Sequence, residues 1–533
     1  MRSGAGKSGM DGAGGRDSPR NGGRDEALVV VLVVAVMMSV YWIARYNGYA
    51  MEVDASRMTQ TADGIIKRGN LVHGKAYPAG FAYPVVVAMI AQLTGERIQS
   101  VQLNASIMIV IVALAAYVCY RALLDSPVAA ALGCLLLLAQ PDFSFYILRS
   151  SHEKVTWGLT LLGWFFLARI HQSIERTAER RAYAGLFYIV FWGLVTTNVY
   201  FAATVLFGLG VHLFGVGWTY WRGRGKVRLR DEGKYLRTLA IVILASFGLL
   251  LALIHWVYPP AQDSYQVLRS LVIHLKNLHD EARLRQPYDY VTATWIRPGA
   301  YALLTAPQWG IVLVSVVGWW LGRKEWMRSG PKRGLLGWMY LGFGLLVGVG
   351  VLVDFSGFLS ANLQVRWFPA FALVSSPVAA DSVLRWIRRW RYHSRTLVAV
   401  LGSALAGYAL AAAMLKVTNE PTLSNQWLVY TPAELEGMRW MEGHLRGQRV
   451  WTGMTAHQVD VFRFWEGYGA ARENVFEYGE ASTPPRNIMV SRLKWMQAKR
   501  YGVVLPGTLG YDRVYDNGAV QVWRRWPMTV YQK

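Results

Sequence analysis

Long apolar segments alternate with short polar ones along most of the chain. Several of these segments approach the ~20 residues that an α-helix needs to cross a bilayer. The pattern therefore predicts a polytopic α-helical membrane protein with about eleven transmembrane helices. The predicted spans are residues 27–44, 101–123, 128–139, 157–168, 182–195, 201–218, 238–257, 300–321, 335–353, 371–384 and 396–415.

Two regions near the N-terminus depart from this pattern. Residues 1–25 are mostly Gly, Ser, Arg and Asp, so we expect them to be disordered and cytoplasmic. The alternative for residues 27–44 is a cleaved signal peptide, but no A-x-A-like cleavage site follows them. Residues 84–93 are apolar over only about half a span, which predicts a helix on or dipping into the membrane surface.

The C-terminal part of the chain changes character after the last span. Residues 417–533 begin with a helical pattern and end with strand patterns, with Asn517-Gly518 as a hairpin signal. This indicates a small α/β domain. The chain is thus divided into a disordered N-terminus (1–25), a membrane domain (26–416) and a small C-terminal domain (417–533).

The formal charge of +23 is explained by the placement of the basic residues. Dense Arg/Lys clusters near Arg180, Arg224, Lys324 and Arg389 fall on one side of the predicted bundle. By the positive-inside rule, this side and the N-terminus are cytoplasmic, the C-terminal domain is extracytoplasmic, and the chain lies in the plasma (inner) membrane. The charge then orients the chain and contacts anionic lipids. The basic residues are split among short loops, which argues against nucleic-acid binding.

The outer side instead gathers carboxylates, histidines and single arginines. A transporter would more often place such groups near the bilayer midplane, within repeated halves, and no repeat is evident. The two cysteines, Cys119 and Cys134, fall within predicted spans. We interpret them as small buried apolar residues, since neither a disulfide framework nor a zinc site can be built from them outside the membrane.

The first outer loop is the strongest candidate for chemistry. It carries an acidic pair, Glu52 and Asp54, before a helical run that Gly69 ends and an aromatic segment, AYPAGFAYP, at residues 76–84. Asp54 at the membrane edge is a candidate active-site residue. The alternative is that Asp54 caps the N-terminus of the following helix.

A second polar segment, RSSHEK, spans residues 149–154. Its Arg149, His152 and Glu153 are candidate site residues, whereas the alternative is a solvated helix start with an acid near the N-terminus. The histidines of the loop at residues 258–298 show no metal-like spacing, so we interpret them as surface residues.

The first outer loop resembles that of the GT-C glycosyltransferases, integral-membrane enzymes that use polyprenyl-phosphate or polyprenyl-diphosphate sugar donors. The resemblance rests on Asp54, Ala62, Gly69 and the aromatic segment from Tyr77-Pro78 to Tyr83-Pro84. RSSHEK is similar to the Arg-Ser stretch with acidic ligands in oligosaccharyltransferase catalytic subunits. VRWFP, with Arg366, is similar to a segment of the family in which an Arg holds the lipid phosphate.

The resemblance implies a GT-C-like membrane fold with surface helices in the first outer loop, and a donor-binding site on the outer face. Asp54 and Glu153 would be catalytic, with Asp54 as general base. Whether the same two residues also hold a divalent ion, Mg²⁺ or Mn²⁺, is left open. Substrate-binding residues would be Glu52, Lys75, Tyr77, Arg149, His152 and Arg366. The alternative for Arg366 is an anchor at the outer membrane interface, whose side chain snorkels toward water.

The sequence also departs from the family's oligosaccharyltransferases. The acceptor motif WWDYG is absent, with FWEGYG at residues 464–469 as a distant echo, and the DxD motif is reduced to His152-Glu153. This favours a single-sugar transferase acting on an unidentified hydroxyl acceptor, which could belong to a lipid, a glycan or a protein. The alternatives are an oligosaccharyltransferase-like enzyme, a transporter or flippase of lipid-linked saccharides, and a membrane scaffold.

Overall fold

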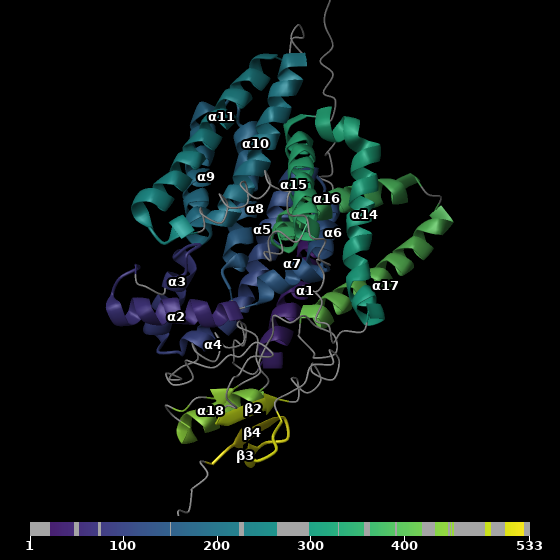
Figure 1. Cartoon of the computed structure of the whole chain (residues 1–533). Coiled ribbons are helices and arrows are strands. Elements are labelled where there is room, and N and C mark those ends of the chain that lie inside the picture. The colour runs from purple at the N-terminus through teal and green to yellow at the C-terminus, as the bar shows by residue number, and fades with distance from the viewer. Residues whose placement is uncertain are drawn as a thin grey trace, which may run out of the picture.

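The structure is a computed structural model that describes residues 22–46, 53–72, 76–149, 151–222, 229–263, 298–328, 330–356, 363–389, 392–417, 432–445, 448, 450–451, 486–491 and 507–526. These residues are mostly helical (Figure 1). The helices are α1 (Gly22–Tyr46), α2 (Val53–Arg68), α3 (Ala82–Thr94), α4 (Ile98–Asn104), η1 (Ala105–Ile107), α5 (Met108–Leu124), α6 (Pro127–Leu138), α7 (Pro141–Leu148), α8 (Glu153–Gln172), α9 (Thr177–Thr197), α10 (Val199–Arg222), α11 (Leu229–Ala252), η2 (Leu253–Val257), α14 (Pro298–Arg328), α15 (Gly330–Ser356), α16 (Leu363–Arg389), α17 (Tyr392–Val417) and α18 (Pro432–His444).

Among the described residues, eight helices are long and apolar enough to cross a membrane, or nine if the bent pair α6 and α7 forms one span. Helices α8 and α9 have 20 and 21 residues but carry charged residues near their ends, and they are not among these eight. The fold is therefore that of a polytopic helical membrane protein, and the count of about eleven spans stays a prediction.

The first helix begins earlier than the sequence predicts. Helix α1 begins at Gly22, within the segment that we expected to be disordered, and residues 1–21 lie outside the described part of the chain. Arg24 and Glu26 are good helix formers, and Asp25 in the first turn is favoured by the helix dipole. The helix can therefore begin several residues before the apolar run.

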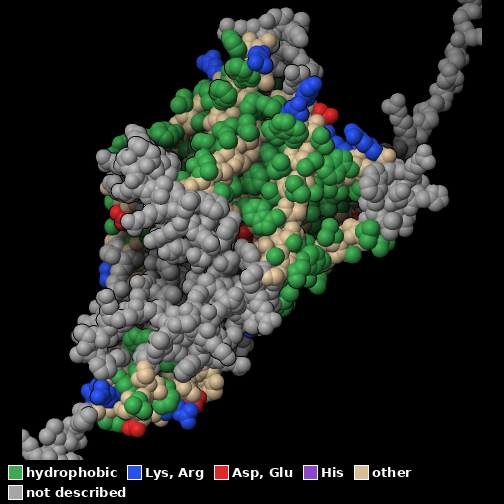
Figure 2. Space-filling view, turned by 45° about the vertical axis from the view of Figure 1, so that its right-hand side comes forward, with side chains coloured by type: hydrophobic (Ala, Val, Ile, Leu, Met, Phe, Trp, Pro, Cys, Tyr) green, Lys and Arg blue, Asp and Glu red, His purple; other side chains and the backbone are tan. Residues whose placement is uncertain are grey.

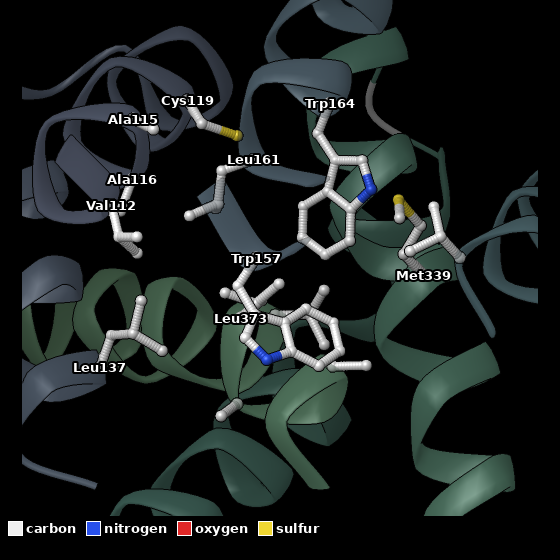
Figure 3. Packing of buried hydrophobic residues seen from close by; sticks show 14 of the residues in the cluster. Val112, Ala115, Ala116, Cys119, Leu137, Trp157, Leu161, Trp164, Met339 and Leu373 are labelled. Carbon is white, nitrogen blue, oxygen red and sulfur yellow. The ribbon is translucent and has the colours of Figure 1, made fainter. Parts of the chain in front are cut away.

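The membrane core combines aliphatic, aromatic and small side chains. Figure 3 shows Trp157 and Trp164 of α8 among side chains of α5, α6, α15 and α16. Both indoles are almost fully buried, and both cysteines are completely buried, as predicted. By contrast, Leu244 and Leu352 expose 70% and 71% of their side chains, as residues facing lipid do.

The first outer loop folds as the sequence predicts. Helices α2, α3 and α4 pack against one another below the bundle in Figure 1, with Met58 and Ala62 of α2 completely buried. Helix α2 ends at Gly69, whose φ of +66° is accessible to glycine, and the Gly69 amide bonds the Ile65 carbonyl at 2.9 Å. The short apolar helix predicted at residues 84–93 is α3.

The C-terminal sheet has four described strands, β1 (Val450–Trp451), β2 (Asn487–Ser491), β3 (Asp512–Asp516) and β4 (Val520–Arg524), in the order β1-β2-β4-β3. Strand β1 is parallel to β2, and the other pairs are antiparallel. The predicted hairpin at Asn517-Gly518 joins β3 to β4, and the Asn517 side-chain amide donates to the Ala433 carbonyl of α18. A small helix-and-sheet unit is thus confirmed, while its predicted boundaries remain a prediction.

One end of the membrane bundle is basic. Figure 2 shows Lys and Arg side chains along the upper end, above a broad apolar face, and α2 to α4 lie at the opposite end in Figure 1. Exposed basic residues on the helices that reach this end are Arg222, Arg323, Lys324, Arg388 and Arg389.

Candidate active site at the junction of helices α7 and α8

The site follows a sharp bend of the chain between α6 and α7. Helices α6 and α7 are bent by 79° at a break where Pro141 starts α7, because proline lacks the N–H that would continue α6. The Gln140 side chain bonds the Ser376 hydroxyl of α16 at 2.6 Å and fixes this corner. Helix α7 is only 8 residues long, so it delivers Arg149, directly after it, to the start of α8.

The centre of the site is a buried ion pair. The Arg149 guanidinium donates to Oε1 of Glu153, and the Ser151 hydroxyl donates to Oε2 of the same carboxylate. Arg149 and Glu153 expose only 5% and 2% of their surfaces. Glu153 is also the first residue of α8, where the helix dipole favours a negative charge. The alternative of a solvated helix start is therefore wrong.

His152 is held by an asparagine from a different element. Asn198, between α9 and α10, lies 2.5 Å from Nε2 of His152 through its Nδ2. The Asn198 Oδ1 accepts from the Phe201 amide at 3.0 Å, which fixes the orientation of the side-chain amide. In this orientation the Asn198 amide donates to Nε2 of His152, and Nδ1 of the ring lies 3.8 Å from Glu153.

The aromatic segment of the first outer loop is attached to this site by its backbone. The Phe81 amide donates to the Thr196 carbonyl at 2.9 Å, and the Val199 amide donates to the Ala79 carbonyl at 2.8 Å. A Cβ at Gly80 would lie 2.5 Å from the Thr196 carbonyl oxygen and still closer to that of the next residue. Only glycine permits this approach. We call residues 79–81 the Gly80 strap.

Aromatic side chains surround His152. Tyr77 lies beside it, with ring centroids 5.2 Å apart, and Phe201 lies on another side at 6.1 Å. The Tyr258 hydroxyl donates to the Tyr77 carbonyl at 2.6 Å. Tyr77 is half-buried, so it can present part of its ring to a ligand while its backbone is held.

Arg366 lies at the edge of this cluster. It is exposed in the first turn of α16, and the next residue, Trp367, stacks on Tyr200 of α10 with an interplanar angle of 4°. Tyr200 in turn packs against Phe201, which lies beside His152, so the first turn of α16 is close to the cluster.

The structure thus brings four of the predicted site residues together, Tyr77, Arg149, His152 and Glu153, and places Arg366 nearby. Asp54 lies in the first turn of α2, because the described helix begins at Val53, so a position just before the helix is not supported. The Asp54 side chain, Glu52 and Lys75 are outside the described parts of the chain, as are residues 264–297 and the FWEGYG segment at residues 464–469.

Two residues of the site were not predicted from the sequence. Asn198 interrupts an apolar run, and this isolated amide between two helical patterns was the available signal. Lys154 belongs to RSSHEK but was not assigned a role, and its side chain is completely buried next to Tyr83, with Nζ 6.0 Å from the ring centre. A buried lysine is rare unless it is paired or functional.

The proposed metal ligands are only partly described. Both carboxylate oxygens of Glu153 accept hydrogen bonds from Arg149 and Ser151. Among the described residues, no group of three or more His, Cys, Asp or Glu side chains is arranged to hold a metal ion. The Asp54 side chain is outside that set. The described residues therefore supply hydrogen bonds and positive charge here, not a set of oxygen ligands.

Similar proteins were found among solved structures and not among sequences. No family profile and no curated protein sequence matches the chain. The Archaeoglobus fulgidus oligosaccharyltransferase, solved with a tethered acceptor peptide, is similar with a TM-score of 0.52 and 10% identity, over 86% of this chain. This chain spans 61% of the length of that enzyme.

Two further solved structures are similar at lower scores. ArnT from Cupriavidus metallidurans bound to undecaprenyl phosphate matches with a TM-score of 0.48 and 13% identity, over 95% of this chain and 100% of its own. The mycobacterial arabinofuranosyltransferase AftD matches with a TM-score of 0.39 and 14% identity, over 81% of this chain and 31% of its own. The bent membrane bundle, the packed first outer loop and the likeness to the archaeal enzyme together show that the chain has the fold of the GT-C glycosyltransferases.

Proposed function

We propose that the protein is a membrane glycosyltransferase that moves a single sugar from a polyprenyl-phosphate donor to a hydroxyl acceptor on the outer face of the plasma (inner) membrane. The observation that carries this proposal is the buried Arg149–Glu153 pair beside His152, to which the Gly80 strap attaches the first outer loop. A charged cluster buried at this position is costly for folding, so a function is the best account of it.

The fold supports the same proposed function. The fold is similar to that of an oligosaccharyltransferase. The use of a lipid-linked sugar donor comes from the family that the first outer loop resembles. Fold alone does not define the reaction, so the residues of the site carry the proposal. The reduced DxD motif and the missing WWDYG motif favour transfer of one sugar over transfer of an oligosaccharide.

The reaction has simple chemical demands. The acceptor oxygen forms a bond to the anomeric carbon, the bond from that carbon to the phosphate oxygen breaks, and the acceptor proton passes to a base. Asp54 is the proposed base, and Glu52, Lys75 and Tyr77 would contact the substrates. Arg149 and Arg366 would stabilise the charge left on the polyprenyl phosphate, since guanidinium groups fork onto phosphate oxygens.

The orientation of the chain follows from charge. The basic end seen in Figure 2 would face the cytoplasm, and α2 to α4, the site and the C-terminal domain would face outward. With α8 and α9 counted as spans and the pair of α6 and α7 as one, the bundle would cross the membrane about eleven times. Both substrates would then meet at the outer leaflet.

The proposal is tested by incubating the purified protein in bilayers with radiolabelled polyprenyl-phosphate sugars and a mixed cell-envelope acceptor fraction. We expect label to move from the lipid to an acceptor, with Asp54→Asn reducing the rate at least ~100-fold, the scale of general acid–base catalysis. Ser56→Ala, two positions further along α2, is the control, and we expect it to retain the wild-type rate. Full transfer by Asp54→Asn would remove Asp54 from the mechanism.

A flippase would give a different result in the same system. It would move labelled lipid between the leaflets of a vesicle without transferring the sugar to another molecule. Label that changes sides but stays on the polyprenyl carrier would therefore contradict the transferase proposal.

A further inference from the structure

The helix that begins as α11 ends in an unusual turn. Pro259 and Pro260 follow Tyr258, and proline cannot continue a helix and disfavours helical geometry in the residue before it. Tyr258 accordingly has φ −138° and ψ 82°, and its amide donates to the Leu253 carbonyl, five residues back, at 2.8 Å. The result is a single π-helical turn, η2. Such turns are rare and are often found at functional sites.

This turn directs the Tyr258 side chain into the protein. Residues 255–257 are exposed, whereas Tyr258 exposes none of its surface. The Tyr258 hydroxyl donates to the Tyr77 carbonyl at 2.6 Å, and its ring centroid lies 5.2 Å from that of Phe81. A buried tyrosine hydroxyl usually finds an acceptor, so this bond alone does not indicate a function.

The place of Tyr77 in the site gives the bond its significance. The Tyr77 ring is half-buried, its centroid lies 5.2 Å from that of His152, and Tyr77 is one of the proposed substrate contacts. The Gly80 strap, residues 79–81, fixes the same segment after Pro78, where it bonds the turn before α10. Tyr258 fixes the segment at a second point, at the residue whose ring lies beside the site.

We propose that Tyr258 is a positioning residue, whose hydroxyl holds the Tyr77 backbone and thereby sets the Tyr77 ring where it contacts the polyprenyl-phosphate donor. This inference rests on the proposed function, and it assigns Tyr258 no contact with the substrates. A ring that is held in place favours the bound donor before and during the reaction alike. Loss of the hydroxyl should therefore weaken donor binding and raise KM, with little change in kcat.

The first measurement asks whether Tyr258 acts through Tyr77. Undecaprenyl phosphate is titrated into the purified wild type, Tyr258→Phe, Tyr77→Ala and the double variant, and binding is followed by native mass spectrometry. We expect Tyr258→Phe to bind about 5- to 10-fold more weakly than the wild type, the scale of one hydrogen bond. In the Tyr77→Ala background the same substitution should have no further effect, because no ring remains to be positioned.

Tyr120→Phe is the matched control. The Tyr120 hydroxyl is also buried and donates to a backbone carbonyl, that of Leu373 at 2.8 Å, but it joins α5 to α16 in the membrane core. Each substitution removes one buried hydrogen bond, so both should lower the melting temperature. Only Tyr258→Phe should weaken binding. In the transfer assay, only Tyr258→Phe should raise the KM for the donor, with kcat within about twofold of the wild type.

The outcomes separate the inference from the proposed function. Unchanged binding in Tyr258→Phe, an equal loss in Tyr120→Phe, or a full additional loss in the Tyr77→Ala background would overturn the inference. A wild-type protein that does not bind the lipid would do so as well. Sugar transfer by the wild type would leave the glycosyltransferase proposal intact in the first three cases. The expected binding pattern without any sugar transfer would support the inference and contradict the proposed function.

Discussion

Glu153 is the residue on which the geometry of the site most depends. Its carboxylate holds Arg149 at the end of α7 and Ser151 in the turn, while it begins α8. RSSHEK indicated a polar cluster, but the sequence could not show that it is buried, because burial depends on the Gly80 strap and on α10. Asn198 was missed for the same reason, since it belongs to a distant part of the chain.

The substitution Glu153→Gln should separate this role from that of a surface acid. It leaves the buried Arg149 charge without its counter-ion, which typically costs about 3–5 kcal/mol, and we expect a lower melting temperature and a near-complete loss of transfer. Thermal unfolding in detergent and initial transfer rates measure both effects. Glu179→Gln is the matched control, as it removes an exposed acid from the first turn of α9. Equal effects of the two substitutions would contradict the central place of Glu153.

At the scale of elements, the Gly80 strap and the corner between α6 and α7 build the site. The first outer loop was predicted well because local signals define it: the apolar spacing of Met58 and Ala62, and the glycine at the end of α2. The sharp corner was not predicted, although Pro141 was visible, because a proline alone does not fix a 79° bend. The bond from Gln140 to Ser376 of α16 holds the corner in place, and this partner is distant in the sequence.

Gly80→Ala tests the strap. The new methyl group would collide with the carbonyl oxygens of Thr196 and Thr197, which belong to backbone and cannot rotate away. We expect at least ~10-fold slower transfer and a cost above the ~1 kcal/mol of an ordinary glycine substitution. Gly185→Ala, in α9 with open space around the position, is the control and should unfold at or above the wild-type temperature. A fully active Gly80→Ala protein would show that the strap does not position the site.

At the scale of the whole molecule, α17 is joined to the site by a second, largely buried ion pair. Lys416, at the end of α17, pairs with Asp142 of α7, and Gln308 of α14 donates to the same carboxylate at 2.6 Å. The helix that precedes the C-terminal domain is thereby tied to the helix that ends at Arg149. The sequence placed these three residues in separate segments and gave no sign that they meet.

A double-mutant cycle of Asp142→Asn and Lys416→Met measures this connection. Because each partner is largely buried, we expect each single substitution to destabilise the protein, and the pair to show a coupling energy of about 1–3 kcal/mol. Chemical unfolding followed by tryptophan fluorescence gives the four stabilities. Additive effects would mean that the two side chains do not interact in the folded protein.

The sidedness of the bundle underlies the whole account, because acceptor, donor and site residues must share one face. Single cysteines are introduced at Asn70, Arg366 and Lys324, all exposed, while native Cys119 and Cys134 are buried. A membrane-impermeant maleimide is then applied to intact cells and to permeabilised cells. We expect labelling of positions 70 and 366 in intact cells and of position 324 only after permeabilisation. Labelling of positions 70 and 366 from opposite sides of the membrane would contradict a shared outer site.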